Sequence, residues 1–181
     1  MSPDLRACPI LVEAQNSKIM TGFSLTSAKF CASEIISACK ERNWSIQFSD
    51  EETEDSFKLQ LLKERDIQGW KVSFEGKVCY MWFYFFYGNS NIMSYGVLNS
   101  IKKPFSIIPM KQFFWMCDTY QKYFKFKKLR GVSRASNLLA KKMALGPAAR
   151  FFGVYQEAIL KKENVYGGIA RDVCFYTKNY Y

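Results

Sequence analysis

The sequence contains no histidine, and this absence excludes several kinds of active site. Without an imidazole, the chain cannot build a Ser-His-Asp or Cys-His nucleophilic site, an HExxH metal site or a mixed Cys/His zinc finger. The six cysteines include no CxxC pair, so a four-cysteine zinc site has no support either. We therefore assign no catalytic residue of these kinds and expect no bound metal.

Long apolar runs and a leader segment are also missing. The longest apolar run, 78–87, has ten residues, which is about half the length of a bilayer-spanning helix. No positively charged segment precedes an apolar one at the start of the chain. The sequence thus predicts an intracellular protein without a signal peptide or transmembrane segment. Its cysteines are expected to be reduced and mostly buried.

Apolar residues, by contrast, are plentiful. They make up 49% of the 181 residues, and aromatic residues make up 17%. Such a composition excludes collagen-like, mucin-like and wholly disordered chains, because it can bury a large core. The length suits one domain, with or without an appendage.

Positive charge is concentrated in the second half of the chain. Residues 1–99 contain ten Lys and Arg against twelve Asp and Glu, a net charge of −2, whereas residues 100–181 contain sixteen against four, a net charge of +12. Such a basic segment repels itself unless an anion binds it. Nucleic acid is the commonest such anion. An acidic protein or an anionic membrane surface is an alternative partner.

The hydrophobic pattern of the first half predicts a helix packed on an antiparallel sheet. Apolar residues recur every three or four positions over 24–42, which indicates a helix. Beyond it, polar and apolar residues alternate as in half-buried strands. The strands are expected at 45–48, 57–61, 70–74, 78–87 and 92–98, the third and fourth forming a hairpin around Gly76.

The second half is predicted to be mainly helical. Helices are expected at 110–128, at 133–145 with Ser133 as N-cap, and at 148–163, followed by a strand pair over 165–176. The fold class is therefore α+β. A helix-and-sheet part spans 1–103 and a basic helical part spans 104–181, and the two could form one continuous domain.

Residues 147–163 resemble a helix-turn-helix DNA-binding unit of the bacterial regulator type. Ala149 is the small residue where two helices would cross, Gly153 opens the turn and Ile159 is the following core residue. The resemblance implies a recognition helix that begins near Tyr155. Glutamine can read adenine and lysines can hold phosphates. The candidate nucleic-acid-binding residues are Lys125, Lys127, Lys128, Arg130, Arg134, Tyr155, Gln156, Lys161 and Lys162.

A second segment, 130–139, resembles the acyl-CoA pyrophosphate loop of the GNAT acetyltransferase superfamily. That loop has the pattern Arg-Gly-x-Gly-x-Gly/Ala before a helix, and Ser133 replaces its central glycine here. The resemblance implies that Arg130, Gly131, Ser133 and Ala135 bind the cofactor through a helix N-terminus. It also implies a preceding strand, for which 113–119 is the candidate, and a mixed sheet that spans the whole chain.

Two functions of different classes follow from these patterns. The leading interpretation is a non-enzymatic nucleic-acid-binding protein, with DNA as the preferred partner and no cofactor. The alternative is a GNAT-like N-acyltransferase that uses acyl-CoA. A further alternative, an adaptor for an acidic protein or an anionic membrane, explains the charge but not the spacings.

Overall fold

The structure, a computed structural model, describes residues 4–41, 48, 50–99 and 110–181. Seven strands form one mixed sheet in the order β1-β2-β3-β4-β5-β7-β6. All neighbouring strands are antiparallel except β4 and β5, which are parallel. The strands are β1 (Ser24–Ser27), β2 (Ile67–Phe74), β3 (Lys77–Phe85), β4 (Ile92–Asn99), β5 (Lys128–Arg134), β6 (Tyr155–Tyr166) and β7 (Ile169–Asn179).

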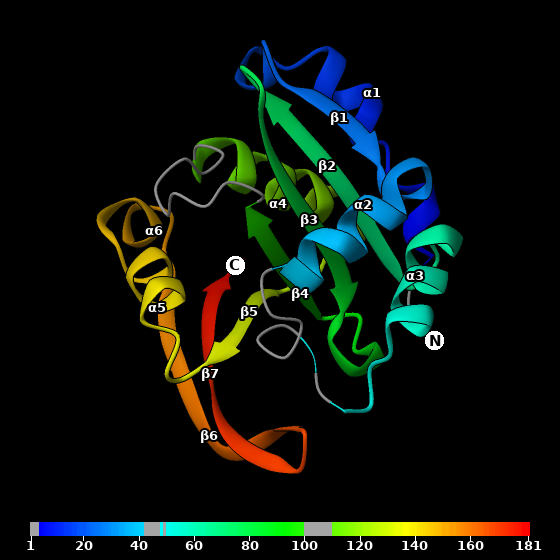
Figure 1. The fold of residues 1–181 in the computed structure, drawn as a ribbon. Coiled ribbons are helices and arrows are strands. Elements are labelled where there is room, and N and C mark those ends of the chain that lie inside the picture. The colour runs from blue at the N-terminus through cyan, green and yellow to red at the C-terminus, as the bar shows by residue number, and fades with distance from the viewer. Residues whose placement is uncertain (1–3, 42–47, 49, 100–109) are drawn as a thin grey trace.

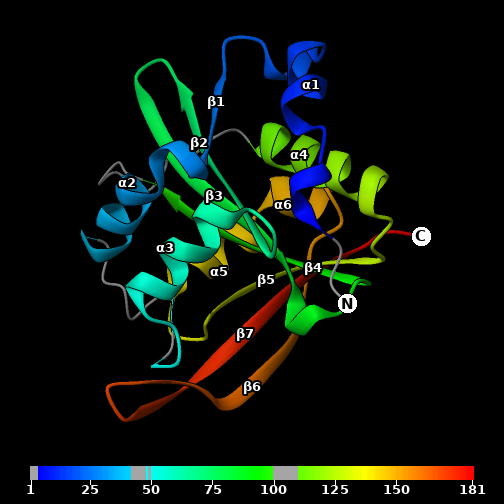
Figure 2. The ribbon, with the colours of Figure 1, turned by 90° about the vertical axis from the view of Figure 1, so that its right-hand side faces the viewer.

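Helices cover both faces of this sheet (Figures 1 and 2). On one face, α2 and α3 pack on a core that includes Ile35, Phe57 and Trp82. On the other, α1, α4 and α6 enclose a second core with Met93 and Phe113. The helices are α1 (Ile10–Gln15), α2 (Ala28–Glu41), α3 (Glu54–Lys63), α4 (Met110–Phe124), α5 (Leu138–Ala144) and α6 (Pro147–Phe151), with short 3-10 turns at Leu5–Ala7, Lys18–Met20 and Phe86–Gly88.

Helix α4 connects the two parallel strands, as a crossover between parallel neighbours requires. It buries Phe113, Cys117 and Tyr120 at helical spacing. The Tyr120 hydroxyl accepts a hydrogen bond from Nε1 of Trp70 at 2.6 Å and donates one to Oε1 of Gln68 at 2.5 Å. This buried chain ties α4 to β2. The helix predicted over 110–128 is confirmed, and it ends at Phe124.

Several other sequence-based elements are confirmed. Strands β2 and β3 form the predicted hairpin, and β4 matches the strand expected at 92–98. The strand pair expected over 165–176 is present as the longer strands β6 and β7, which meet at Gly167 and Gly168. The helix expected over 24–42 begins at Ala28, after the short strand β1. The strand expected at 45–48 lies, apart from Phe48, outside the described residues.

The strand predicted at 57–61 is wrong, because these residues belong to α3. The side chain of Thr53 accepts a hydrogen bond from the Ser56 amide and caps this helix. Phe57 and Leu61, four residues apart, are its buried residues. An alternation of polar and apolar residues over five positions fits one face of a helix as well as a strand.

The mainly helical second half is also a wrong prediction, since the chain after α4 forms β5, β6 and β7 with two short helices between them. Ser133 lies in β5, and α5 begins only at Leu138, where Oδ1 of Asn137 accepts a hydrogen bond from the Ala140 amide. Gly153, with a φ of 80°, turns the chain after α6 into β6. Pairing with β7 outweighs the helix-like apolar spacing of 148–163.

All six cysteines are free thiols, five of them buried, as predicted. Burial raises the pKa of Cys39 and Cys79 to about 12, so these thiols stay protonated. In the described part of the chain, no helix is long and apolar enough to cross a membrane. The same residues bring together no group of three metal-ligating side chains.

Candidate functional site

The sheet opens in its middle, where β4 and β5 part. The two strands pair only where Ile92–Tyr95 of β4 lies opposite Lys128–Gly131 of β5. Beyond this point β4 pairs with β3 alone and β5 pairs with β7 alone. The facing edges of 96–98 and 132–134 therefore carry backbone N–H and C=O groups that no strand of the described residues pairs with. The carboxyl ends of parallel strands at such an opening are a common ligand site.

A hollow lies at this opening and takes residues from five strands. It has about 100 Å³ of space open to water, which suits a slender ligand chain rather than a bulky one. Aromatic rings from β3 and β4 form one side, and polar groups from β5 and β6 form another. The lining residues are Trp82, Tyr84, Tyr95, Gly96, Val132, Ser133, Arg134, Asn164 and Val173.

Two glycines let the aromatic rings lie against the parting strands. Gly96 is the register partner of Trp82, and a methyl group there would overlap the indole ring. Gly131 is the register partner of Tyr95, and a Cβ there would be 2.5 Å from the tyrosine hydroxyl oxygen. Trp82 packs on the α2–α3 side and Tyr95 on the α4 side. The opening is thus flanked by one aromatic ring on each face of the sheet.

The first turn of α4 lies beside the opening. The ring of Phe113 packs edge-on against Tyr95, with centroids 4.8 Å apart. This turn contains no acidic residue, so the partial positive charge of the 15-residue helix is not cancelled there. The connection from β4 to α4, 100–109, lies outside the described residues; its sequence includes Lys102 and Lys103 and no glycine.

The hydroxyl groups near the opening are held in the protonated form. Burial, and then the nearby groups of Cys117 and Tyr176, raise the pKa of Tyr95 well above its ordinary value. Burial likewise raises the pKa of Tyr176, which is next to Gly131 in the sheet, to about 12. A protonated phenol is a hydrogen-bond donor at neutral pH. Among the described residues that line the hollow there is no carboxylate.

The structure places the predicted phosphate ligand Arg130 in a different role. Its guanidinium lies against the rings of Phe86 and Phe175, 5.0 and 4.7 Å from their centroids, and Nη2 is 2.7 Å from Oε2 of Glu157. Glu157 also accepts a hydrogen bond from Lys128. Only 12% of the Arg130 side chain is exposed. The ion pair with Glu157 neutralises Arg130, and burial leaves little of the guanidinium accessible to a phosphate.

The segment 130–135 is therefore not the strand-to-helix loop that the GNAT resemblance implied at this place. Gly131 and Ser133 lie within β5, and the amide of Ala135 donates to the carbonyl oxygen of Asp172 at 2.9 Å. The preceding strand expected at 113–119 is part of α4. Only Ser133 of the four cofactor candidates, with its neighbour Arg134, lines the hollow.

The helix-turn-helix interpretation of 147–163 is wrong, because the expected recognition helix is the strand β6. On this strand Nζ of Lys161 lies 2.9 Å from Asp172 and the Lys162 amide donates to the same carboxylate, while the Tyr155 hydroxyl accepts a hydrogen bond from Asn179. Gln156 is exposed on β6. Lys125 and Lys127 are exposed between α4 and β5.

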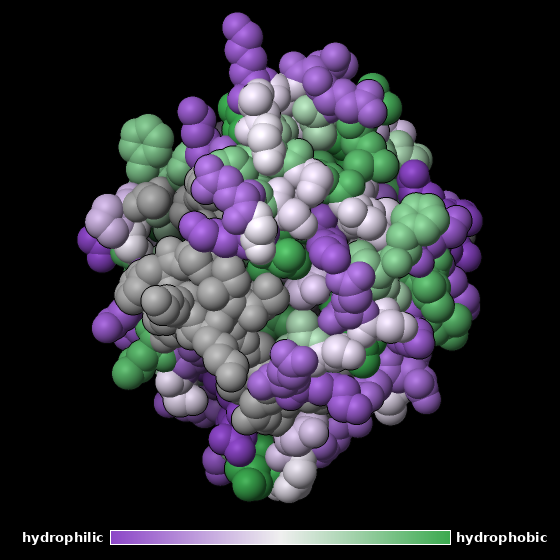
Figure 3. Space-filling model, turned by 45° about the horizontal axis from the view of Figure 1, so that its top comes forward, coloured by the Kyte–Doolittle hydropathy of each residue, from purple (hydrophilic) through white to green (hydrophobic). Residues whose placement is uncertain are grey.

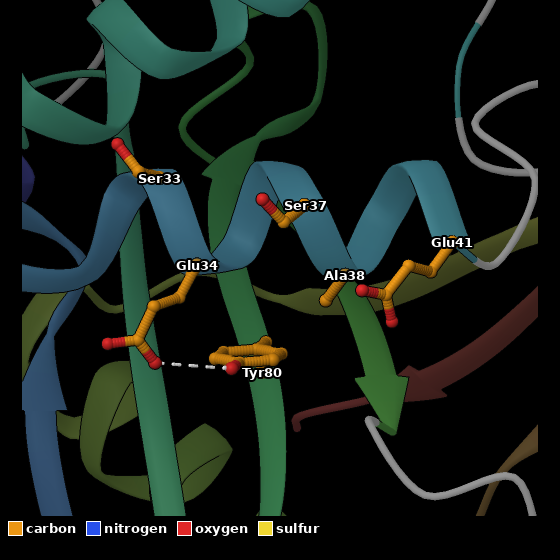
Figure 4. A pocket seen from close by; sticks show the side chains of 6 residues that line it. All are labelled: Ser33, Glu34, Ser37, Ala38, Glu41 and Tyr80. Carbon is orange, nitrogen blue, oxygen red and sulfur yellow. Dashed lines mark hydrogen bonds between the residues drawn. The ribbon is translucent and has the colours of Figure 1, made fainter.

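A second, shallower hollow lies along α2 (Figure 4). It is lined by Ser33, Glu34, Ser37, Ala38, Glu41 and Tyr80. Glu34 accepts hydrogen bonds from Nζ of Lys71 at 2.5 Å and from the Tyr80 hydroxyl at 3.4 Å. This carboxylate is therefore engaged in holding α2 on the sheet, and we place the functional site at the strand opening.

Sequence reasoning missed most of the residues that line the opening. Trp82, Tyr84 and Tyr95 read as ordinary strand residues, because their period fits a buried sheet. The one available signal was Gly96, a glycine inside a strand pattern, since such a glycine often marks a close approach of other atoms.

Comparison with known proteins identifies the fold. No model of a known protein family matches the sequence, and no curated protein matches it. Among solved structures, an acetyltransferase of Salmonella typhimurium that modifies the N-terminal serine of ribosomal protein L7/L12 superposes with a TM-score of 0.67 at 11% identity, covering 90% of this chain and 98% of that one. The microcin C7 self-immunity acetyltransferase MccE, in complex with acetyl-CoA and AMP, gives 0.66 at 14% identity, covering 90% and 95%. A ribosomal-protein-alanine N-acetyltransferase of Brucella melitensis gives 0.64 at 17% identity, covering 87% and 99%.

The chain thus has the fold of the GNAT acetyltransferases over nine-tenths of its length. This finding corrects two sequence-based interpretations. The prediction of a non-enzymatic DNA-binding protein is wrong, since its recognition helix is a strand and the similar structures are acetyltransferases. The expectation of no cofactor is corrected as well, because similar structures hold acetyl-CoA.

Proposed function

We propose that this chain is an acyl-CoA-dependent N-acyltransferase whose reactive centre is the opening between β4 and β5. One observation carries the proposal. The two parallel strands part after Tyr95 and Gly131 and leave a lined hollow between their carboxyl ends. The similarity of the whole sheet to acetyltransferases supports the same location.

The chain's own groups fit an acyl-CoA at this place. The unused strand edges at 96–98 and 132–134 offer donors and acceptors to the amide groups of a pantetheine arm. The N-terminus of α4, next to Tyr95, offers its partial positive charge to a pyrophosphate. When bound, the cofactor supplies an acyl group activated as a thioester.

The residues of the hollow then position and desolvate the reacting groups. Trp82 and Tyr84 exclude water from one side, and the protonated hydroxyl of Tyr95 is a hydrogen-bond donor near the strand edge. In the transfer, the acceptor nitrogen forms a bond to the acyl carbon, the carbon–sulfur bond breaks, and the thiolate of the leaving group gains a proton. Since the described residues of the lining include no carboxylate, the proton that the acceptor amine loses passes to solvent, and solvent supplies the proton that the thiolate gains.

A blocking substitution tests this assignment. Acetyl-CoA that binds the native state raises the unfolding midpoint, because at a hundredfold excess over Kd it adds about 2.7 kcal/mol to the free energy of unfolding. Val132→Trp should abolish this shift, because the larger side chain fills the hollow that Val132 lines. Val165→Trp is the matched control, because Val132 and Val165 are 38% and 39% exposed and only Val132 lines the hollow.

The measurement is a thermal melt with and without millimolar acetyl-CoA, followed by an assay of free thiol released in the presence of amines. Equal shifts in Val132→Trp and the wild type would place the cofactor elsewhere. The absence of both a shift and thiol release in the wild type would contradict the proposed activity.

A further inference from the structure

The hollow at the strand opening is closed at its inner end. Tyr95 and Gly131 form the last pair of the parallel ladder, and the free edges 96–98 and 132–134 begin directly beyond it. A linear ligand between these edges therefore has one end at that last pair. In an acyl-CoA this is the acyl end, because the hollow, at about 100 Å³, is too small for the nucleotide.

The apolar walls near this inner end lie on the α2–α3 side of the sheet. Trp82 packs in the core under α2 and α3. Val132 lines the hollow from β5 and Val173 lines it from β7. Both valines point to the same side as Trp82, because side chains alternate along a strand and the neighbouring Gly131 and Cys174 face the α4 side. An alkyl chain at the inner end buries apolar surface when it points to this side.

Trp82 is fixed at this wall by its packing. Its indole lies on the backbone of Gly96, where a Cβ would overlap the ring. The ring also stacks with Phe48, at a centroid distance of 6.3 Å, and meets Phe57 edge-on at 5.4 Å. All three aromatic side chains are buried, and Trp82 is only 4% exposed. An interior packed in this way has little space for an added group.

The open side of the hollow is needed by the acyl acceptor. Val132 is 38% exposed, so the hollow opens to solvent beside β5. Arg134 and Asn164, two polar residues of the lining, lie farther along their strands from the last ladder pair. The acceptor amine has to reach the acyl carbon from solvent. An acyl chain that turned outward would block the amine, so a chain that reacts has to point toward Trp82.

We propose that Trp82 sets the length of the acyl group that this chain transfers, and that it restricts the donor to short acyl groups such as acetyl. The inference rests on the proposed function for the presence of an acyl-CoA in the opening. A longer chain has to displace the packed indole or turn into the path of the amine. One methylene too many in a closely fitting apolar pocket changes specificity by roughly tenfold or more.

Binding of CoA thioesters is the first test. Calorimetric titration gives Kd for CoA, acetyl-CoA and hexanoyl-CoA with the wild type, Trp82→Leu and Trp70→Leu. We expect the wild type to bind hexanoyl-CoA roughly tenfold or more weakly than acetyl-CoA. Trp82→Leu should bring the two Kd values together or reverse their order. Trp70 is the matched control, because it is 2% exposed, packs in the core on the α4 side and does not line the hollow.

Donor specificity in the transfer is the second test. Thiol release with the amine that the wild type acetylates gives kcat/KM for acetyl-CoA and for hexanoyl-CoA. The ratio of the two values within one variant does not depend on the fraction of folded protein, so a purely structural role would not move it. Trp82→Leu should shift this ratio toward hexanoyl-CoA by roughly tenfold or more. Trp82→Phe, which removes less of the side chain, should shift it in the same direction and serves if Trp82→Leu fails to fold.

The outcomes separate this proposal from the proposed function. Equal Kd values for both thioesters in the wild type, or an unchanged preference in the folded Trp82 variants, would overturn the role of Trp82 and leave the acyltransferase standing. A shift in Trp70→Leu as large as in Trp82→Leu would overturn that role as well. Tighter binding of hexanoyl-CoA by Trp82→Leu, without transfer by the wild type to any amine, would support the role of Trp82 and refute the acyltransferase. A wild type that binds none of the three compounds would overturn both.

Discussion

Glycine at positions 96 and 131 is a packing requirement rather than a source of flexibility. The sequence pattern had placed Gly131 against a phosphate, but the atom that occupies the space is the hydroxyl oxygen of Tyr95. At Gly96 the indole of Trp82 takes the corresponding space on the other face. Both glycines therefore act by letting an aromatic ring lie against a neighbouring strand.

Substitution of Gly131 should be costly for this reason. Gly131→Ala puts a methyl group into contact with Tyr95, so we expect it to lower the free energy of unfolding by roughly 1–3 kcal/mol. Urea denaturation measures the change, with Ser133→Ala on the same strand as the control. In the Tyr95→Phe background, which removes the nearest atom, the cost of Gly131→Ala should be smaller. An equal cost in both backgrounds would show that the clash lies elsewhere.

Glu157 links β6 to β5 through Arg130 and Lys128. Burial alone would raise the pKa of this carboxyl, but hydrogen bonds from Lys128, Thr177 and Arg130 outweigh burial and lower it below 4.5. A lowered folded-state pKa means that the ionised carboxylate stabilises the fold fully above about pH 5, and that this contribution is lost as the pH falls through the folded value.

Glu157→Gln should therefore cost about 1–3 kcal/mol at pH 7, because two partly buried cations lose their counter-charge. The difference from the wild type should shrink between pH 5 and pH 3. Unfolding by urea at several pH values measures it, and Glu163→Gln, an exposed residue on the same strand, is the control. A difference that stays constant over this range would contradict the assigned ionisation.

At the scale of elements, the sequence correctly predicts the helices and strands whose apolar residues follow one dominant period or are bounded by a strong turn signal. The hairpin of β2 and β3 and the strand β4 follow from such patterns. Helix α4 was predicted from its length, because its apolar spacing also fits a strand but nineteen residues without a breaker are long for one. The segments at 57–61 and 148–163 were misassigned because their apolar spacing fits both helix and strand. The N-cap Thr53 stabilises 57–61 as part of a helix, and pairing with β7 makes most of 148–163 a strand. Pairing between distant segments leaves no local signal in one sequence.

The candidate site was predicted less well than the fold, for the same physical reason. Ser133 was named from the sequence as an acyl-CoA ligand and Arg134 as a nucleic-acid ligand, and both line the hollow. Trp82 and Asn164 could not be named, because they reach the site only when β3 and β6 are brought to it by the sheet order. A site assembled from five strands has no contiguous motif.

The far end of the β6–β7 hairpin is held by a single carboxylate. Asp50 accepts hydrogen bonds from the amides of Gly167 and Gly168 at 2.8 and 3.3 Å, and its own amide donates to the carbonyl oxygen of Val165 at 2.8 Å. Asp50→Ala should release this turn, with faster amide exchange at Gly167 and Gly168. Global stability should fall by about 1 kcal/mol or less, since the site is exposed.

Hydrogen exchange measured by NMR tests this release, with Glu51→Ala, an exposed neighbour, as the control. Unchanged exchange at the two glycines in Asp50→Ala would mean that the turn is stable without its carboxylate.

For the whole molecule, net charge indicated a need for anions but not where they bind. Lys128, Arg130 and Lys161 have carboxylate partners within the fold. On the face drawn in Figure 3, hydrophilic and hydrophobic residues are interspersed. The charge balance of the sequence therefore overstates the number of cations that are available to an outside anion.

The parting of β4 and β5 also has a mechanical meaning. Only four residue pairs join the sheet of β1–β4 to the sheet of β5–β7. A ligand that forms hydrogen bonds with both free edges connects the two parts of the sheet at the point where few backbone hydrogen bonds join them. Occupancy of the opening therefore adds to the shared core in making the two halves of the protein unfold as one cooperative unit.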